Sequence, residues 1–366
     1  MKITKIESIP VRVPLKGEWR ISSGARTYSD YVIVKVYTDE NIIGLGEASP
    51  VPRWAEETQG SIVYAIEKLI NPSIIGMDPF QFDRINEKMD SLMQRNIFAK
   101  AAVDMALYDI AGKSLHVPVY KLIGGLYRKR VPLAFVTGIK TFQEAQKDIE
   151  KALQDGFKTF KIKVGNNISE DLDLVRQVRK CIGDNLEITV DANAGWETKE
   201  AIEAINRLDE YYLGAVEQPV QRWNIDGLRE VRNSVRPAIM ADESLFDLHD
   251  ALMLIKHEAA DIFNTYVSKG GGMANNQKVV AVAEAAGIPC LLGSMVELGI
   301  GTAAGLHFVA ATKNVCLPNY IVGTLMHKDD IIEEEFELKD GCLEVPERDG
   351  LGVTLSDKKI EKYRVQ

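Results

Sequence analysis

The segments Glu187-Ile-Thr-Val-Asp191, Gly214-Ala-Val-Glu217 and Ala238-Ile-Met-Ala-Asp242 decide the fold, because each is a short apolar run that ends on an acidic residue. Such runs are typical of buried strands, and the acids follow one another at intervals of about 25 residues, the length of one strand and one helix. In a parallel barrel the carboxyl ends of the strands meet at one mouth. The three segments therefore predict a parallel α/β barrel, with a doubly wound open sheet as the alternative topology.

The same alternation of apolar runs and amphipathic helical stretches extends on both sides, beginning at Val131. The eight expected strands are 132–137, 159–164, 187–191, 214–217, 238–242, 261–267, 289–293 and 316–321. Helices expected between them include 170–181, 199–208, 275–286 and 301–311. Eight strands separated by helices favour the barrel.

The two ends of the chain have a different pattern. Residues 3–11 and 31–37 alternate apolar and polar side chains and are followed by turn-rich stretches, which predicts antiparallel strands. A helical region is expected over 55–115. From about residue 328 the pattern is again typical of strands and turns, and we expect this tail to pack on the N-terminal segment.

Composition excludes several classes of function. The 366 residues carry a net charge of −9, which disfavours nucleic acid and anionic membrane as partners. The four cysteines are scattered, no run approaches the length of a membrane span, and the first residues lack the apolar core of a signal peptide. We therefore expect a protein of the reducing cytoplasm. A homo-oligomer is expected as well.

Asp191, Glu217 and Asp242 are candidate metal ligands. Three carboxylates that converge on one barrel mouth repel one another unless a cation lies between them, and oxygen ligands suit Mg²⁺, with Mn²⁺ as a substitute. Each acid alone could instead be a helix N-cap at a strand–helix junction. Because all three acids directly follow apolar strands, the metal site is favoured over three separate N-caps.

Lys161 and Lys163 lie on the preceding expected strand, in Thr159-Phe-Lys-Ile-Lys163. Side chains alternate along a strand, so both lysines point into the barrel mouth. Each lowers the pKa of the other, and a nearby divalent cation does the same, which moves one amine toward its neutral form. A neutral amine beside a metal-bound carboxylate is suited to abstract an α-proton. The alternative is that both lysines extend toward solvent from an edge strand or pair with the acids.

Six motifs, in this order, resemble those of the enolase superfamily, and within it the muconate-lactonizing (muconate cycloisomerase) subgroup. The resemblance extends over the whole chain, and this superfamily is known for a lysine or histidine base that works with Mg²⁺. The motifs are Lys-Ile-Lys (161–163), Val-Asp-Ala-Asn (190–193), Val-Glu-Gln-Pro (216–219), Ala-Asp-Glu-Ser (241–244), Lys-Gly-Gly-Gly (269–272) and Gly-Ser-Met-Val-Glu (293–297).

The resemblance implies a (β/α)7β modified TIM barrel with an α+β capping domain. It divides the chain into an N-terminal capping domain (1–125), a barrel domain (126–327) and a tail that returns to the cap (328–366).

The resemblance also implies roles for individual residues. Asp191, Glu217 and Asp242 would bind the metal, and Lys163 would be the base, assisted by Lys161. Two cap loops would close over the substrate, and several side chains would contact it. The expected substrate-binding residues are Trp19, Arg20, Arg53, Trp54, Asn193, Glu297 and Asn319.

The sequence departs from the family pattern on the sixth strand. Relatives in this subgroup that racemise, epimerise or cyclise usually carry a lysine three residues before the lysine of Lys-x-Gly-Gly, and here that position is Tyr266. Lys269 matches the other lysine, which is not normally the base. Tyrosine, with an ordinary pKa near 10, is a poor base at neutral pH. One-base chemistry by Lys163 is therefore favoured.

A second departure concerns the eighth strand. Dipeptide epimerases carry Asp-x-Asp there to bind an ammonium group, whereas this chain has Pro318-Asn-Tyr-Ile321. The five histidines, expected on the surface or on helices, do not lie at strand ends as a histidine base would.

Three hypotheses follow. The favoured one is a metal-dependent lyase or cycloisomerase that acts on a small carboxylate such as an acid sugar, a muconate-like diacid or a cyclic amino acid. The second is a racemase or epimerase in which Tyr266 or Lys269 serves the face opposite Lys163. The third is a non-catalytic relative that binds a carboxylate, against which the Lys161–Lys163 pair argues.

Overall fold

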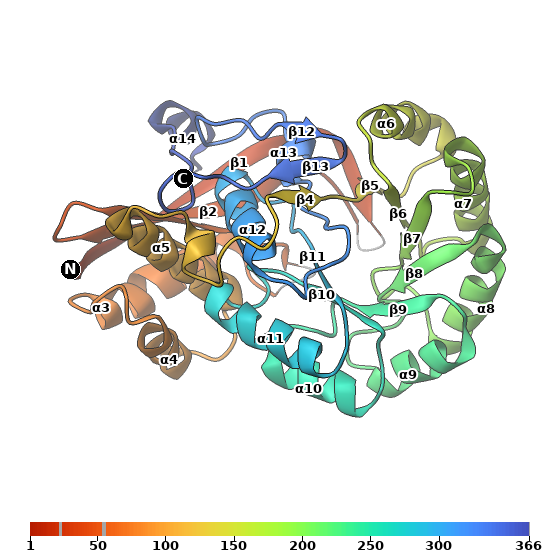
Figure 1. Cartoon of the computed structure of the whole chain (residues 1–366), viewed down its shortest axis with the longest axis horizontal. Helices are drawn as coiled ribbons and strands as arrows, with labels where there is room; N and C mark the ends of the chain where they lie inside the picture. Colours follow the sequence, from red (N-terminus) through yellow and green to blue (C-terminus); the bar gives the residue numbers. More distant parts are fainter. Residues whose placement is uncertain (22–23, 53–55, 366) are drawn as a thin grey trace.

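The structure is a computed structural model that describes residues 1–21, 24–52 and 56–365. Two parts lie side by side, a barrel of parallel strands surrounded by helices and a cap of antiparallel strands and helices (Figure 1). None of the helices in these ranges is long and apolar enough to cross a membrane.

In the described part of the chain, seven parallel strands form the barrel wall, and each pairs with its neighbours in chain order. They are β5 (Phe135–Thr137), β6 (Thr159–Lys163), β7 (Glu187–Asp191), β8 (Leu213–Glu217), β9 (Ala238–Ala241), β10 (Ile262–Thr265) and β11 (Cys290–Leu292). The register places Lys163 beside Asp191, and Asp191 beside Glu217. The ends of three adjacent strands therefore carry their charged side chains at one level.

The expected eighth strand closes the barrel, although it pairs through single bridges. Val315 bridges Cys290 of β11, and Asn319 bridges Leu133, just before β5. The backbone N–H of Tyr320 also donates to the carbonyl of Leu292 at 2.8 Å. The barrel is thus of the (β/α)7β type that the sequence predicts.

The expected first strand, 132–137, is divided in two. Its beginning is β4 (Arg130–Pro132), which pairs with a strand of the C-terminal tail, and its end is β5. Between β4 and β5 the chain passes from the small antiparallel sheet to the barrel, so a single apolar run contributes a strand to each of the two sheets.

Helices pack against the outside of the barrel (Figure 1). They are α6 (Phe142–Gln154), α7 (Ile168–Ile182), α8 (Thr198–Leu208) with the 3₁₀ turn η3 (Asp209–Tyr211), α9 (Ile225–Ser234), α10 (Leu248–Lys256), α11 (Met273–Ala285) and α12 (Gly299–Ala311). Helix α6 begins with a capping box between Thr141 and Glu144, and buries Ala145, Ile149 and Ala152 at helical spacing.

The cap consists of an antiparallel sheet and a helical layer. The strands are β1 (Ile3–Ile21), β2 (Gly24–Thr38) and β3 (Ile43–Ala48). The helices are α2 (Gln59–Tyr64), the π-helix η1 (Ala65–Ile70), α3 (Asn71–Ile74), α4 (Phe82–Leu92), α5 (Ile97–Leu115) and the 3₁₀ turn η2 (Val119–Lys121). The helical region that the sequence predicts is therefore several helices, of which α5 is the buried one.

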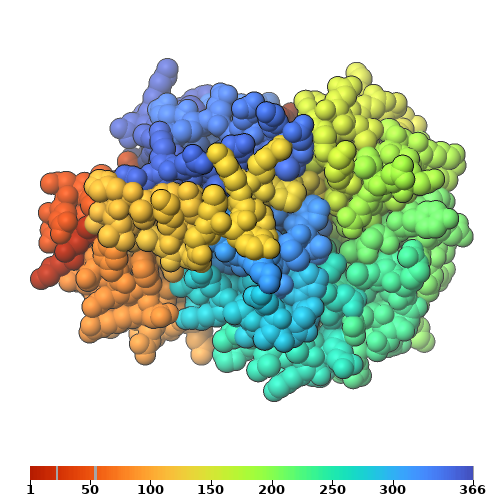
Figure 2. Space-filling model, in the orientation of Figure 1, coloured from red at the N-terminus to blue at the C-terminus, as the bar shows by residue number. Residues whose placement is uncertain are grey.

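The C-terminal tail contacts both parts. It contains α13 (Gly323–Met326), β12 (Leu338–Lys339), β13 (Cys342–Glu344) and α14 (Asp357–Tyr363). Strand β13 pairs with β4 of the barrel segment, while the N–H of Val365 donates to the carbonyl of Pro10 in β1. In the space-filling view the tail, coloured blue, lies along the upper edge of the molecule (Figure 2).

Gly46 allows β3 to lie directly on α5. A Cβ atom at this position would lie 1.8 Å from the carbonyl oxygen of Ala102. Gly46→Ala is therefore expected to lower the free energy of unfolding by about 1–3 kcal/mol, since backbone on both sides must move. Urea unfolding measures this. Gly60→Ala is the matched control, because only a side-chain atom of Thr58, at 3.9 Å, lies near that Cβ. Equal stability of the two variants would contradict the close packing.

Candidate active site

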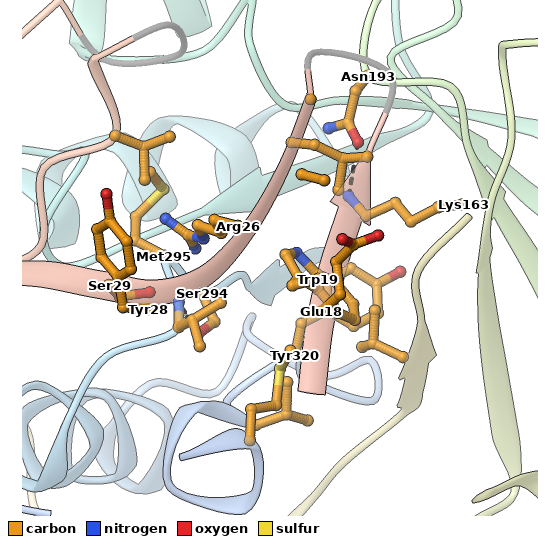
Figure 3. A pocket seen from close by; sticks show the side chains of 18 of the residues that line it. Glu18, Trp19, Arg26, Tyr28, Ser29, Lys163, Asn193, Ser294, Met295 and Tyr320 are labelled. Atoms are coloured by element: carbon orange, nitrogen blue, oxygen red, sulfur yellow. Dashed lines mark hydrogen bonds between the residues drawn. The ribbon is translucent and has the colours of Figure 1, made fainter. Parts of the chain in front are cut away.

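A cavity of about 750 Å³ lies between the cap sheet and the mouth of the barrel. Its barrel side includes Lys161, Lys163, Asn193, Asp242 and Tyr266. Its cap side is formed by residues 18–19, 21, 24–30 and 50–52. Figure 3 shows the Lys163 ammonium group directed into this cavity beside Asn193. The ends of β6 and β9 and the residues just after β7 and β10 therefore open onto this cavity.

Lys161 and Lys163 bind the strand-end acids. Lys163 Nζ donates to Asp191 Oδ2 at 2.5 Å, and Lys161 Nζ lies 2.8 Å from the same oxygen. Lys161 Nζ also donates to Glu217 Oε1 at 2.8 Å. Lys161 further lies over the ring of Tyr320, 3.9 Å from its centre. The alternative that the lysines pair with the acids thus describes the present arrangement.

The pKa of Lys161 is shifted in the direction opposite to the one expected for two neighbouring lysines. Burial alone would lower the pKa of Lys161, but the charges of Asp191 and Glu217 outweigh burial and hold that pKa well above its usual value. Burial would raise the pKa of Asp191, and the ammonium groups of Lys161 and Lys163 hold it below its usual range instead. Burial and the charge of Asp191 raise the pKa of Glu217. Lys161 is therefore a fixed cation here, not an amine close to neutrality.

Asp242 is held by residues from the sixth strand–helix unit. Lys269 Nζ donates to Asp242 Oδ1 at 2.6 Å, to the Asp242 carbonyl at 2.7 Å and to the Asn264 carbonyl at 2.9 Å. The Tyr266 hydroxyl donates to Asp242 Oδ2 at 3.0 Å. Burial and the charge of Asp242 raise the pKa of Tyr266 well above its usual value. Tyr266 is therefore a hydrogen-bond donor to a carboxylate.

The three strand-end acids offer the oxygen ligands of a Mg²⁺ site, but their side chains are not arranged around a common point. They are Asp191, Glu217 and Asp242. Each of the three side chains is no more than 2% exposed and offers only carboxylate oxygens. In the described ranges, no three acidic, histidine or cysteine side chains are placed so that they could hold a metal ion. Each carboxylate contacts a lysine, because a buried negative charge is stabilised by pairing with a nearby positive charge. By their chemistry, three buried carboxylates with oxygen donors alone fit Mg²⁺.

Asn193 contacts the expected base, where the sequence predicts a contact with substrate. Lys163 Nζ donates to Asn193 Oδ1 at 2.7 Å, and Asn193 Nδ2 donates to Glu243 Oε1 at 3.0 Å. Glu243, which follows Asp242 directly in the chain, is therefore linked to Lys163 through one amide. Asn193 also lines the cavity, so a contact with substrate stays a prediction.

The other expected substrate-binding residues lie in different places. Trp19 lines the cavity, whereas Arg20 extends from the same strand to Glu18, with 2.5 Å between Arg20 Nη2 and Glu18 Oε1. Arg53 and Trp54 lie outside the described residues.

Glu297 and Asn319 both form hydrogen bonds within the protein, and their contacts with substrate stay predictions. Glu297 accepts from the Ser294 hydroxyl at 2.5 Å and from the Met295 N–H at 2.9 Å, and so shapes the loop after β11. Asn319 is fully buried, accepts from the Leu292 N–H at 2.8 Å and donates to the carbonyl of Leu317 at 3.1 Å. Its polar atoms are used to close the barrel.

The five histidines lie on helices or at helix ends, in agreement with the expectation of surface or helix positions, and two of them are buried. His116, His249 and His257 lie on or at the ends of helices. His307 is on α12 but fully buried. His327 is buried at the C-terminal end of α13, and its Nε2 lies 2.7 Å from the Tyr31 hydroxyl. These two rings fill space between the barrel, the cap and the tail.

Sequence reasoning missed the cavity residues of β2 and of the loop after β11. They are Arg26, Tyr28, Ser29, Met295 and Val296. Alternation along β2 divides its residues between two faces, but it does not show which face meets the barrel. The Ser294-Met-Val-Glu297 motif was recognised only for its acid, while its neighbours form the cavity wall.

Two family models match most of the chain. Residues 3–124 match the mandelate racemase/muconate lactonizing enzyme N-terminal domain, and residues 144–359 match the enolase C-terminal domain-like family.

Relatives with three different activities are similar over nearly full length. An N-succinyl-L-Arg/Lys racemase of Bacillus cereus is 33% identical over 100% of this chain and 98% of its own, and its crystal structure superimposes with a TM-score of 0.96. A hydrophobic dipeptide epimerase of Enterococcus faecalis is 38% identical over 86% of this chain and 89% of its own. Its structure with Mg and the dipeptide L-Leu-L-Tyr has a TM-score of 0.92, covering 97% of this chain and 100% of that one. A chloromuconate cycloisomerase of Cupriavidus necator is 35% identical over 99% of both chains.

Proposed function

This chain belongs to the mandelate racemase/muconate lactonizing enzyme family of the enolase superfamily, and from that premise we propose that Lys163 abstracts the α-proton of a small carboxylate at a Mg²⁺ site. Asp191, Glu217 and Asp242 would hold the ion. When bound, Mg²⁺ supplies positive charge that stabilises the enediolate left by proton removal. The chain is an enzyme, like the racemase, epimerase and cycloisomerase that it matches.

The observation that carries the proposal is the place of Lys163. Both lysines line the cavity, but the Lys163 side chain is 10% exposed, whereas that of Lys161 is 4% exposed, covered by Tyr320 and held by two carboxylates. Lys163 shares Asp191 with Lys161 and is oriented by Asn193. A base must reach the proton that it takes, and the greater exposure of Lys163 supports it, of the two lysines, as the base.

The fate of the intermediate depends on the opposite side of the site. Strands β6 and β10 flank the three acid-bearing strands, so Lys163 and Tyr266 lie on either side of the carboxylates. Tyr266 donates to Asp242, and Lys269 is nearly fully buried against the same acid. Neither is placed as a second base, which supports β-elimination or cycloisomerisation. The racemase and epimerase among the relatives keep proton return to the opposite face as the second candidate, with Tyr266 as its donor.

Deuterium incorporation tests the proposal and separates its two outcomes. Small carboxylates, including acid sugars, muconate-like diacids and cyclic amino acids, are incubated with the enzyme and Mg²⁺ in D₂O and followed by ¹H NMR. We expect loss of the α-hydrogen with release of a β-substituent or, for a muconate-like diacid, ring closure to a lactone in which the enediolate takes up one deuteron at the α-carbon. Deuterium in recovered substrate of both configurations would instead show racemisation. No exchange in any carboxylate of the panel would refute α-proton abstraction.

A further inference from the structure

Glu243 is the acid that follows Asp242, and its side chain reaches the end of a different strand. Asp242 and Glu243 come directly after β9, whereas Asn193, whose Nδ2 donates to Glu243 Oε1 at 3.0 Å, follows β7. Glu243 is only 7% exposed. It is absent from the described residues that line the cavity at the barrel mouth, where Asn193 and Lys163 are both present. Glu243 therefore lies behind the cavity wall, and any effect that it has on substrate passes through another residue.

The backbone on either side of Glu243 is held by one buried amide. Gln218, which follows the acid at the end of β8, is fully buried. Its Oε1 accepts from the Asp242 N–H at 3.0 Å and from the Ser244 N–H at 3.1 Å. Its Nε2 donates to the Ser244 hydroxyl at 2.8 Å. A buried network in which each member is hydrogen-bonded is rigid, so the direction in which the Glu243 side chain leaves the backbone is fixed from the end of the neighbouring strand.

The Asn193 amide lies between Lys163 and Glu243 and has one favourable orientation. Its Oδ1 accepts from Lys163 Nζ at 2.7 Å, while its Nδ2 donates to Glu243. Rotation of the amide by half a turn would place its NH₂ group against an ammonium group that only donates, and its oxygen against a carboxyl oxygen that accepts. Both ends thus favour the same orientation. Glu243 supplies the acceptor that keeps the Asn193 oxygen directed at Lys163.

Asn193 lies in a turn that is itself held in place. The backbone of Asn193 and Ala194 has φ angles of +43° and +59°, in the left-handed region that most residues avoid and asparagine tolerates. The Asn193 N–H donates to Asp191 Oδ1 at 2.8 Å, and the Ala194 N–H donates to the Gln218 carbonyl at 2.8 Å. The turn is thus bound to the ends of β7 and β8. Both partners of the hydrogen bond between Asn193 and Glu243 therefore leave fixed backbones.

We propose that Glu243 is a positioning residue for the base: it orients the Asn193 amide, and the Asn193 oxygen holds the Lys163 amine at the cavity. The inference rests on the proposed function, because it takes Lys163 as the base. Glu243 neither touches the substrate nor exchanges a proton with it. A general base acts only when its amine lies at hydrogen-bond distance from the proton that it takes. Loss of Glu243 therefore lowers the rate of proton abstraction more than it weakens substrate binding.

Glu243→Met and Glu243→Gln separate the acceptor from the space that the side chain fills. Both side chains are close to glutamate in length, but only glutamine keeps an oxygen that accepts from Asn193. The carboxylate that exchanges fastest in D₂O is used at saturating Mg²⁺. We expect Glu243→Met to lower kcat for α-hydrogen exchange about ten- to a hundredfold with little change in KM, and Glu243→Gln to recover most of the lost rate. Glu203→Met, the same substitution at a side chain that is 73% exposed on α8, is the control and should exchange at the wild-type rate.

A double variant tests the route through Asn193. Asn193→Ala should itself lower kcat, and Glu243→Met should add no further loss in that background, because residues that act through one contact are not additive. Additive losses, a wild-type rate in Glu243→Met, or a loss that additional Mg²⁺ restores would overturn the proposal. If Glu243→Met does not fold, Asn193→Ala tests the same hydrogen bond from its other end, and a wild-type kcat there would overturn the proposal too.

The two proposals fail in different ways. Exchange that depends on Lys163 but not on Glu243 refutes the positioning role alone. Absence of exchange in the wild type, or an undiminished rate in Lys163→Ala, refutes the proposed reaction and the positioning role with it.

Discussion

Lys163→Ala is expected to lower the rate of α-hydrogen exchange by a factor of about 10²–10⁴, the contribution of a positioned general base. The variant should fold, because Asp191 keeps Lys161 at 2.8 Å and so remains neutralised. Exchange of the substrate α-hydrogen in D₂O, followed by ¹H NMR, measures the loss. Binding of substrate should change much less than the rate, since the cavity wall is otherwise intact.

The control for this variant is Lys151→Ala, which removes a lysine that is 72% exposed on α6 and paired only with Asp155 in the described residues. It should exchange at the wild-type rate. If Lys163→Ala also exchanged at that rate, every mechanism with Lys163 as base would be excluded. If Lys161→Met abolished α-hydrogen exchange without loss of Mg²⁺ binding, while Lys163→Ala did not, Lys161 would be assigned as the base in place of Lys163.

The barrel and the acids at its mouth could be predicted because they follow from periodicity. Parallel strands of equal length place their ends at one level, so Lys163, Asp191 and Glu217 align in the register once each apolar run is recognised. The expected first strand failed as one unit, because one apolar run pairs with two sheets. Apolar character alone does not reveal which sheet a strand joins.

The partners of each charged group could not be predicted. Lys161 donates to Glu217, two strands away, as well as contacting Asp191 on the adjacent strand. Lys269, four residues after the end of β10, donates to Asp242. Asn319 faces the barrel wall although the sequence places it at a strand end. These choices depend on distances between side chains, which sequence spacing does not contain. Arg26 was missed because it belongs to a cap strand that no motif marks.

Asp242→Asn is expected to lower the free energy of unfolding by about 3 kcal/mol or more, because Lys269 would keep two carbonyl acceptors but lose the carboxylate at 2.6 Å. Both side chains are no more than 2% exposed, so water cannot replace the lost partner. Urea unfolding without Mg²⁺ measures the effect. The double variant Asp242→Asn with Lys269→Met should regain most of the stability, since it removes the buried charge together with its partner.

Mg²⁺ separates the structural role of Asp242 from its role as a ligand. An ion that binds the folded state stabilises it, by about 2.7 kcal/mol when its concentration is a hundred times the dissociation constant. The wild type should gain this stability on addition of Mg²⁺, and the single and double variants should gain little or none. If the double variant gained as much as the wild type, Asp242 would not be a ligand. If the single variant were as stable as the wild type without Mg²⁺, the ion pair between Asp242 and Lys269 would contribute nothing to stability. Binding of Mg²⁺ by Asp242 would then not have to overcome the loss of that ion pair.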